Sequence, residues 1–132
     1  MIRPDIQALG AEWTGPDGLR IQDRFIRFAY VPNLSDANGA PLYGLLHIEN
    51  LDEGKFAVLV QDPATWPVGG SRELSARSIE EAIVHELVHV RWIDLTADKR
   101  DTTALVQEER ATWATARALV AAKYDKRVND VR

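Results

Sequence analysis

The sequence predicts a single α+β domain over residues 1–132. We expect a small antiparallel or mixed sheet of about three strands, packed on a buried helix that a long C-terminal helix follows. Three observations predict this class. The first half of the chain holds short segments of alternating apolar residues, 79–95 is almost uniformly apolar, and 103–126 has a helical pattern. A chain of this length can bury one core and is short for two domains.

The first half contains one helical segment and three strands. Residues 4–13 are expected to form a short helix, which a Gly-Pro-Asp-Gly turn ends. Residues 20–31 alternate apolar and polar side chains, as a strand does. Two further strands, at 42–49 and 55–61, are separated by a Leu-Asp-Glu-Gly turn and therefore predict a hairpin.

Residues 79–95 predict the most buried helix of the chain. Ser78 and Glu81 have the spacing of a capping box, so the helix is expected to begin after Ser78. The apolar side chains that follow point in nearly all directions around the axis, and such a helix is covered on more than one side. We therefore expect it between the sheet and the last helix, at 103–126, whose tail frays after Lys126.

The buried helix carries the motif His85-Glu86-Leu87-Val88-His89, which reads H-E-x-x-H. Two histidines four residues apart on a helix project from one side, close enough for both rings to bind one Zn²⁺. Glu86 is offset from that side and is free to act as general base on a water molecule that the metal activates. The motif therefore predicts a zinc site with two histidine ligands and a catalytic glutamate.

A catalytic zinc usually has a third protein ligand, which must come from outside the motif. No histidine follows His89 in the chain. Asp94 continues the same helix and points away along it. Asp98 and Asp101 would need a sharp chain reversal, and no glycine is present there to make it. These aspartates are therefore weaker candidates than a glutamate from the last helix.

The last helix offers two adjacent carboxylates, Glu108 and Glu109. Glu109 lies in the middle of the apolar stripe of this helix, and Glu108 lies toward its edge. The stripe consists of Val106, Trp113, Ala116, Val120 and Tyr124. A carboxylate at the centre of a packing face is costly unless it is paired or binds a metal. We expect Glu109 as the third ligand and Glu108 as its alternate, and a further interpretation pairs Glu109 with a buried Arg91.

Composition limits the classes of function. The net charge of −4 and the pI near 5.3 do not favour nucleic-acid binding through a basic surface. The absence of cysteine excludes disulfides and thiolate zinc sites. The N-terminus has no apolar segment of the kind found in signal peptides, and no apolar run reaches the length of a membrane span. The expected location is the cytoplasm, without membrane binding, and association with a virion is left open.

These motifs resemble those of the small gluzincin metallopeptidases, in which H-E-x-x-H on one helix is followed by a glutamate on the next helix about 20 residues later. The segment 109–120 also resembles the E-x-x-A-(N)-x-x-A-x-x-L-L pattern of ImmA/IrrE-type peptidases and minimal single-domain gluzincins. Thr112, Trp113 and Arg91 depart from the family pattern. The resemblance covers about residues 55–122 and implies a zincin-like fold.

The resemblance implies a zinc-dependent endopeptidase that acts on a peptide or protein substrate. Zn²⁺ would be held by His85, His89 and Glu109. Glu86 would take a proton from water and pass it to the leaving amine. An extended substrate would add to the strand at 55–61, taken as an edge strand.

The residue that stabilises the oxyanion is not set by a motif. Gluzincins generally use Tyr, His or Arg, and the candidates here are Tyr124, Arg117 and His47. Trp66, in a proline-flanked loop, is a candidate to border the substrate groove.

Three other functions remain open. One is a non-catalytic, zinc-stabilised structural or assembly domain, such as a virion component. Another is a regulatory peptidase that cuts a single protein partner. The third and weakest is amide hydrolysis on a non-peptide substrate. Glu86 favours catalysis, because a structural site needs the ligands and not the base.

Overall fold

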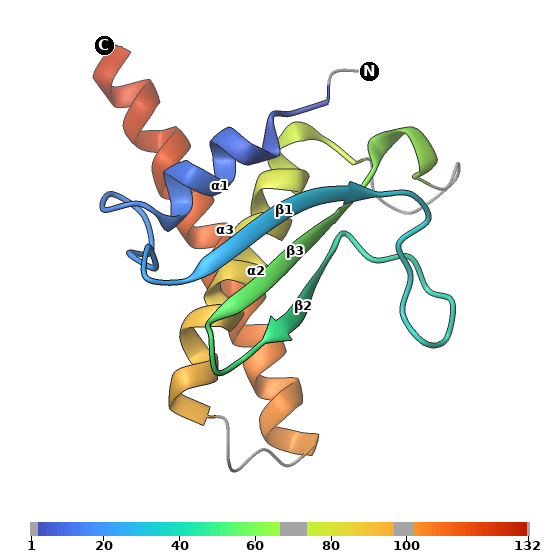
Figure 1. The fold of residues 1–132 in the computed structure, drawn as a ribbon. Coiled ribbons are helices and arrows are strands. Elements are labelled where there is room, and N and C mark those ends of the chain that lie inside the picture. The colour runs from blue at the N-terminus through green and yellow to red at the C-terminus, as the bar shows by residue number, and fades with distance from the viewer. Residues whose placement is uncertain (1–2, 67–73, 97–101, 132) are drawn as a thin grey trace.

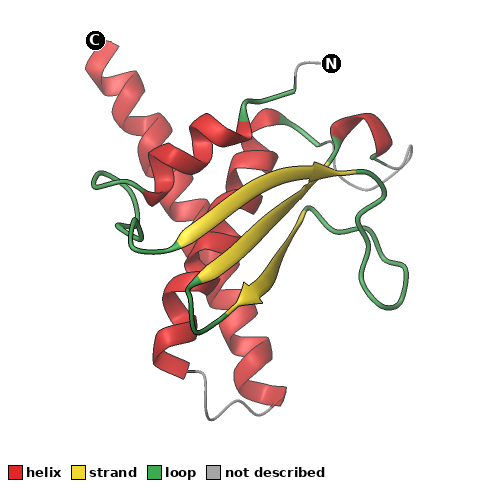
Figure 2. Cartoon of the chain, viewed as in Figure 1, coloured by secondary structure: helices red, strands yellow, loops and turns green. Residues whose placement is uncertain are grey.

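The computed structural model describes residues 3–66, 74–96 and 102–131, and its helices lie on one face of a three-stranded mixed sheet (Figure 1). In chain order the elements are α1 (Ile6–Thr14), β1 (Phe25–Val31), β2 (Gly44–Asn50), β3 (Lys55–Gln61), a short 3₁₀ helix (Pro63–Thr65), α2 (Ala76–Thr96) and α3 (Thr102–Val131). Figure 2 shows the separation of the helical layer from the strands. The predicted α+β class with a three-stranded sheet is confirmed.

The strand order of the sheet is β1-β3-β2, with β3 in the centre. β1 pairs with β3 in parallel and β2 pairs with it antiparallel, so Val58 of β3 lies opposite Phe28 on one side and Leu46 on the other. The expectation that 55–61 is an edge strand is therefore wrong. The physical reason is composition: β3 is apolar on both faces and nearly all buried, whereas β2 is largely exposed and occupies an edge.

The core lies between the sheet and α2, and α3 packs on the other side of α2. The core side chains are fully or nearly buried and come from all layers, among them Phe28, Phe56, Val58, Val60, Ile79, Ile83, Leu87, Ala116 and Val120. The expected position of 79–95 between sheet and last helix is confirmed. Trp92 is an exception to the burial expected of this helix, because it is 38% exposed near the end of α2.

Several element boundaries differ from the expected ones. β1 begins only at Phe25, because Arg20 adopts a positive φ of 55° and a turn follows it, in which the Arg24 N–H donates to the Ile21 carbonyl at 3.2 Å. α2 begins before Ser78, since the Ser75 hydroxyl oxygen accepts a hydrogen bond from the Ser78 N–H at 3.1 Å and so acts as the cap. α3 continues to Val131, past the point where fraying was expected.

A buried polar cluster joins the three helices away from the H-E-x-x-H motif. The Glu80 carboxylate of α2 accepts hydrogen bonds from Trp13 Nε1 of α1 at 2.7 Å and from the Tyr124 hydroxyl of α3 at 2.7 Å. Lys123 Nζ also donates to it and pairs with Glu12 at 2.9 Å. Every buried oxygen of Glu80 is thereby satisfied, so the cluster stabilises the helical packing.

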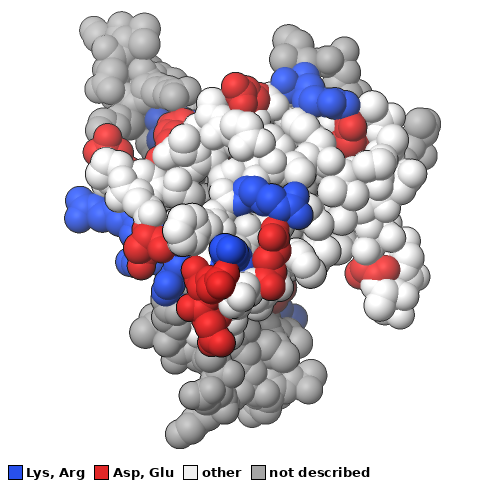
Figure 3. Space-filling model, in the orientation of Figure 1, with Lys and Arg blue, Asp and Glu red and all other residues white. Residues whose placement is uncertain are grey.

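Figure 3 views the face of the sheet opposite the helices, where uncharged side chains predominate and acidic and basic side chains are intermixed. Its described residues form no broad basic patch there. None of the described helices combines the length and the apolarity needed to cross a membrane.

Candidate metal centre

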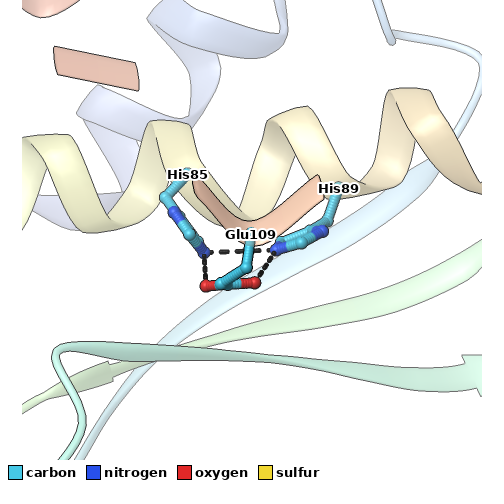
Figure 4. Close-up of side chains that lie close together, drawn as sticks. All are labelled: His85, His89 and Glu109. Carbon is cyan, nitrogen blue, oxygen red and sulfur yellow. Dashed lines mark hydrogen bonds and ion pairs between the residues drawn. The ribbon is translucent and has the colours of Figure 1, made fainter. Parts of the chain in front are cut away.

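Three side chains from two helices converge beside β2. His85 and His89 project from the same side of α2, one turn apart, and Glu109 reaches them from α3 (Figure 4). His85 Nε2 lies 2.7 Å from one carboxylate oxygen of Glu109, and His89 Nε2 lies 3.0 Å from the other. The two Nε2 atoms are 3.2 Å apart. The spacing of the motif on a regular helix is sufficient to bring the imidazoles together.

These donors fit a single small cation. Zinc binds histidine nitrogen and carboxylate oxygen at about 2.0–2.2 Å, so tetrahedral ligands are separated by about 3.4 Å. The two Nε2 atoms, 3.2 Å apart, are spaced close to that value. One donor atom from each of His85, His89 and Glu109 lies within 4.8 Å of the others, so the three residues form a group that could hold a metal ion. Two imidazoles and one carboxylate leave a fourth position for water or substrate.

The burial of the two glutamates is the reverse of what their positions on the stripe indicated. The Glu109 side chain is 51% exposed, whereas that of Glu108 is only 12% exposed. Glu109 therefore does not sit under a packing face; it points into an open cleft. Arg91 is exposed, so the interpretation that pairs Glu109 with a buried Arg91 is wrong. The partners of Glu109 are the two histidines.

Glu108 contacts the opposite nitrogen of the second histidine. Its carboxylate lies 3.3 Å from His89 Nδ1 and can accept the N–H of that nitrogen. Where a metal takes the place of the Nε2 proton that His89 donates to Glu109, this contact would fix the tautomer whose Nε2 lone pair binds the metal. The structure thus places Glu108 behind a ligand and not among the donor atoms that converge. Two adjacent glutamates serve different sides of one imidazole.

His85 is oriented by packing. Its Nδ1 is the one buried side-chain nitrogen or oxygen without a hydrogen-bond partner among the described residues. The Trp113 ring lies 4.0 Å from the imidazole, centroid to centroid, at an interplanar angle of 39°. The sequence predicted Trp113 only as part of an apolar stripe. Its position four residues after Glu109 places it on the same side of α3, which is the signal that links it to the site.

The charges of the site perturb one another. Hydrogen bonds from His85 and His89 hold the pKa of Glu109 far below its ordinary value. Burial alone would lower the pKa of His89, but its hydrogen bond to Glu109 and the nearby charges of Glu86 and Glu109 raise it. The cluster therefore favours an ionised carboxylate that faces two imidazoles. A cation could bind in this arrangement by replacing the protons on the imidazole nitrogens.

Glu86 lies next to the cluster, and its carboxylate Oε1 is 3.8 Å from His85 Nε2. Glu86 is buried, and this burial raises the pKa of its carboxyl. The two histidines and a hydrogen bond from the Leu46 backbone N–H of β2 act in the opposite direction. A carboxylate with a raised pKa, fixed by a strand and close to the metal-binding group, is suited to accept and return a proton.

Two hollows open on either side of the cluster along β2. The first, of about 310 Å³, is polar and aromatic and is lined by residues that include Tyr43, Ser78, Glu81, Trp113 and Arg117. The second, of about 350 Å³, is largely apolar and is lined by residues that include Leu45, Leu46, Ile48 and Ile93. His85, Glu86 and Glu109 line both, so the candidate catalytic group sits at their junction.

The three candidates for oxyanion stabilisation fall in different places. The Tyr124 hydroxyl donates to Glu80 in the cluster between the helices, so it is not available to the cleft. His47 is exposed on β2 and lines neither hollow. Arg117 lines the first hollow, with its guanidinium carbon 5.3 Å from the centroid of Trp113. Of the three, the structure brings only Arg117 to the cleft.

Tyr43 is a cleft residue that the sequence did not reveal. It lies just before β2, lines the first hollow with His85 and Glu86, and stacks on Trp66 at 4.9 Å. Its ring also meets the edge of Trp113 at 6.2 Å. Trp66 thus borders the cleft indirectly, by supporting Tyr43. No local pattern marks Tyr43, because its place follows from the pairing of β2 with β3.

The weaker ligand candidates cannot be placed. The side chain of Asp94, and residues Asp98 and Asp101, lie outside the described part of the chain.

Comparisons with protein-family models, with curated proteins and with solved structures give no match for this chain.

Proposed function

We propose that this chain is a zinc-dependent endopeptidase of the gluzincin type. One observation carries the proposal: His85, His89 and Glu109 converge within 3.2 Å of one another, beside a buried glutamate, at the junction of two hollows along an edge strand. A structural zinc site is usually closed by four protein ligands. This group supplies three donors and opens onto a cleft.

Zinc suits the donor set, because it accepts nitrogen and oxygen ligands in tetrahedral geometry and has no redox chemistry. Bound by the two histidines and Glu109, it would polarise the scissile carbonyl and acidify a water molecule. The residues of this chain do the remaining work of holding the substrate and moving the proton.

Glu86 is the proposed general base. Its carboxylate would accept a proton from the attacking water and then deliver it to the nitrogen of the departing amine. Burial raises the pKa of this carboxyl toward the range in which both transfers are efficient. The Leu46 N–H, which donates to the carboxylate, would keep it directed at the cleft.

The substrate is proposed to add to β2 as a further strand. β2 is an edge strand whose outer backbone is free of strand partners within the described residues. Leu42, Gly44 and Leu46 of this segment line the hollows, so a peptide paired with β2 would pass directly by Glu86. β2 thus takes the role that the sequence had suggested for β3.

The test compares the wild-type chain with Glu86→Gln. Zinc content is first measured by elemental mass spectrometry on protein purified without chelator. We expect about one zinc per chain in both proteins, and loss of zinc in His85→Ala and Glu109→Ala. We then expect the wild type, and not Glu86→Gln, to cleave casein or a peptide library.

Each competing function has its own outcome. Zinc without cleavage of any generic substrate, together with stable capture of one protein by Glu86→Gln, would support a regulatory peptidase. Zinc without cleavage or capture would support a structural domain. A wild-type chain that stays free of metal after zinc is added back would contradict the metal-dependent proposal altogether.

A further inference from the structure

The first hollow holds one positive side chain whose charge is not neutralised. Arg117 is exposed, and the contact of its guanidinium with the Trp113 ring is the one interaction it makes among the described residues. Because Trp113 also packs on His85, only the indole ring separates Arg117 from this residue of the metal-binding group. Stacking on an indole restricts the guanidinium while leaving its N–H groups available.

The acidic groups of the same hollow are already engaged. Glu81 pairs with Arg77 of α2, with 3.5 Å between the guanidinium Nε and the carboxylate. Glu109 faces the two histidines, and the Glu86 carboxylate accepts a hydrogen bond from the backbone of β2. Among the charged groups that line the hollow, Arg117 is therefore the one without a partner of opposite charge in the described residues, and its planar guanidinium matches a carboxylate in shape and charge.

The second hollow has the opposite character, because aliphatic side chains of β2 and α2 line it. The hollows are thus chemically distinct subsites on the two sides of Glu86. A substrate that spans both would place an apolar residue in one and an anionic group in the other.

The direction of β2 determines which hollow receives the N-terminal part of a paired peptide and which receives the C-terminal part. The first hollow lies at the start of this strand, next to Tyr43, and the second extends along it to Ile48. A peptide that pairs antiparallel with β2 enters at Ile48 and leaves at Tyr43. The first hollow then receives residues on the C-terminal side of the cleaved bond.

We infer that Arg117, held on Trp113, selects substrates with a carboxylate on the C-terminal side of the cleaved bond, and that the second hollow takes an apolar residue on the N-terminal side. This inference rests on the proposed peptidase function. The carboxylate has two sources, an Asp or Glu side chain within the peptide or the free end of the peptide chain.

The test uses labelled heptapeptides that differ at one position, where two leucines precede Glu, Gln or Lys and the C-terminus is amidated. A fourth peptide ends at the Gln with a free carboxylate, and a fifth carries Glu before the leucines. Binding to zinc-loaded Glu86→Gln protein is measured by fluorescence anisotropy, so that affinity is read without turnover. The same peptides are then given to the wild-type chain, and cleaved bonds are located by mass spectrometry.

We expect the Glu peptide to bind about tenfold more tightly than the Gln peptide, since a charge-assisted bidentate pair replaces a neutral contact. The Lys peptide should bind most weakly. Adding Arg117→Gln should abolish the preference, so that the Glu and Gln peptides bind with similar affinity. Arg110→Gln, which removes an exposed arginine of the same helix outside both hollows, should keep it. Tight binding of the fourth peptide would assign the chain end as the carboxylate source.

Failure of the inference is distinguishable from failure of the proposed function. Cleavage without any preference for Glu, a preference that survives Arg117→Gln, or a preference only for the fifth peptide would overturn the inference and leave the peptidase standing. Preferential binding of the Glu peptide without cleavage by the zinc-loaded wild type would support the anion subsite and contradict the peptidase. Absence of binding by all five peptides would overturn the inference.

Discussion

Glu108 and Glu109 are neighbours in sequence, yet they act on different atoms. Successive helical residues are rotated by about 100°, so one carboxylate faces the Nε2 atoms of His85 and His89 while the other reaches His89 Nδ1. A pair of acidic residues therefore supplies both a ligand and the group that orients a ligand. The two contributions to metal affinity should differ in size.

Removing Glu108 should weaken the metal site without abolishing it. In Glu108→Ala we expect zinc affinity to fall about 10–100-fold, because His89 loses the acceptor that fixes its ring and tautomer. Competition with a chromophoric chelator measures this. Glu81→Ala, which removes a carboxylate that lines the first hollow and pairs with Arg77, is the matched control and should bind zinc as the wild type does. Equal affinities for wild type and Glu108→Ala would show that packing alone holds His89.

Tyr43 is the residue we expect to stabilise the oxyanion. Its hydroxyl makes no hydrogen bond within the described residues, and its ring is fixed by Trp66 and Trp113 on the wall that it shares with Glu86. Tyr43→Phe removes one oxygen and should lower kcat about 100–1,000-fold, with zinc content unchanged. Steady-state kinetics on a cleaved peptide tests this. An unaltered kcat in Tyr43→Phe, with a loss in Arg117→Gln on neutral peptides, would transfer the role to Arg117.

Among single residues, the sequence best predicts those whose place in the site depends on helix geometry. His85, Glu86 and His89 follow from spacing on one helix, and Glu109 was preferred over its neighbour by its angle around α3. The reason given for that preference was burial, and it was wrong, since Glu109 faces the cleft. Tyr43 could not be predicted, because it meets the site only through strand pairing.

The elements are held together by the cluster around Glu80, which connects α1, α2 and α3. Burial alone would raise the pKa of Glu80, but hydrogen bonds from Lys123, Tyr124 and Trp13 lower it below 4.5. A carboxyl whose pKa is depressed in the folded state stabilises the fold above its unfolded pKa, and this contribution is lost as the pH falls through the folded value. The helical packing should therefore weaken in acid.

Glu80→Gln tests this contribution through urea unfolding at several pH values. At pH 7 we expect the free energy of unfolding to fall by about 3 kcal/mol, because Lys123 loses its buried partner. Below about pH 4.5 the difference from wild type should narrow, as the wild-type carboxyl gains its proton. Glu12→Gln removes the more exposed partner of the same lysine and should cost less than about 1 kcal/mol. A pH-independent loss in Glu80→Gln would attribute the effect to packing.

Strands and helices were predicted where local pattern decides, and the three-stranded sheet was expected, but the order of its strands was not predicted. Alternation located all three strands, and the Leu-Asp-Glu-Gly turn located the hairpin of β2 and β3. The order β1-β3-β2 depends on a parallel pairing between segments 30 residues apart in register, from Phe25 with Lys55 to Val31 with Gln61. Such a pairing leaves no signal in the local sequence, because it joins segments that are far apart in the chain. The entropic cost of bringing them together is offset by the burial of β3 in the whole fold.

At the scale of the whole molecule, the metal site joins the two long helices beside the sheet. His85 and His89 belong to α2, Glu109 belongs to α3, and β2 contributes the backbone that contacts Glu86. An ion that binds these groups together binds the folded chain and not the unfolded one. Metal binding should then appear as stability of the entire domain.

Zinc should raise the melting temperature by about 10 °C when its free concentration is 100 times the dissociation constant, because this adds about 2.7 kcal/mol of stability. Chelator should reverse the shift, and Glu109→Ala should show almost none. His47→Ala, which removes the exposed histidine of β2 outside both hollows, should keep the full shift. Glu86→Gln should keep it too, since the base is not a ligand. Differential scanning calorimetry of these four chains separates metal binding from catalysis, and a shift that survives Glu109→Ala would mean that α3 does not contribute to the site.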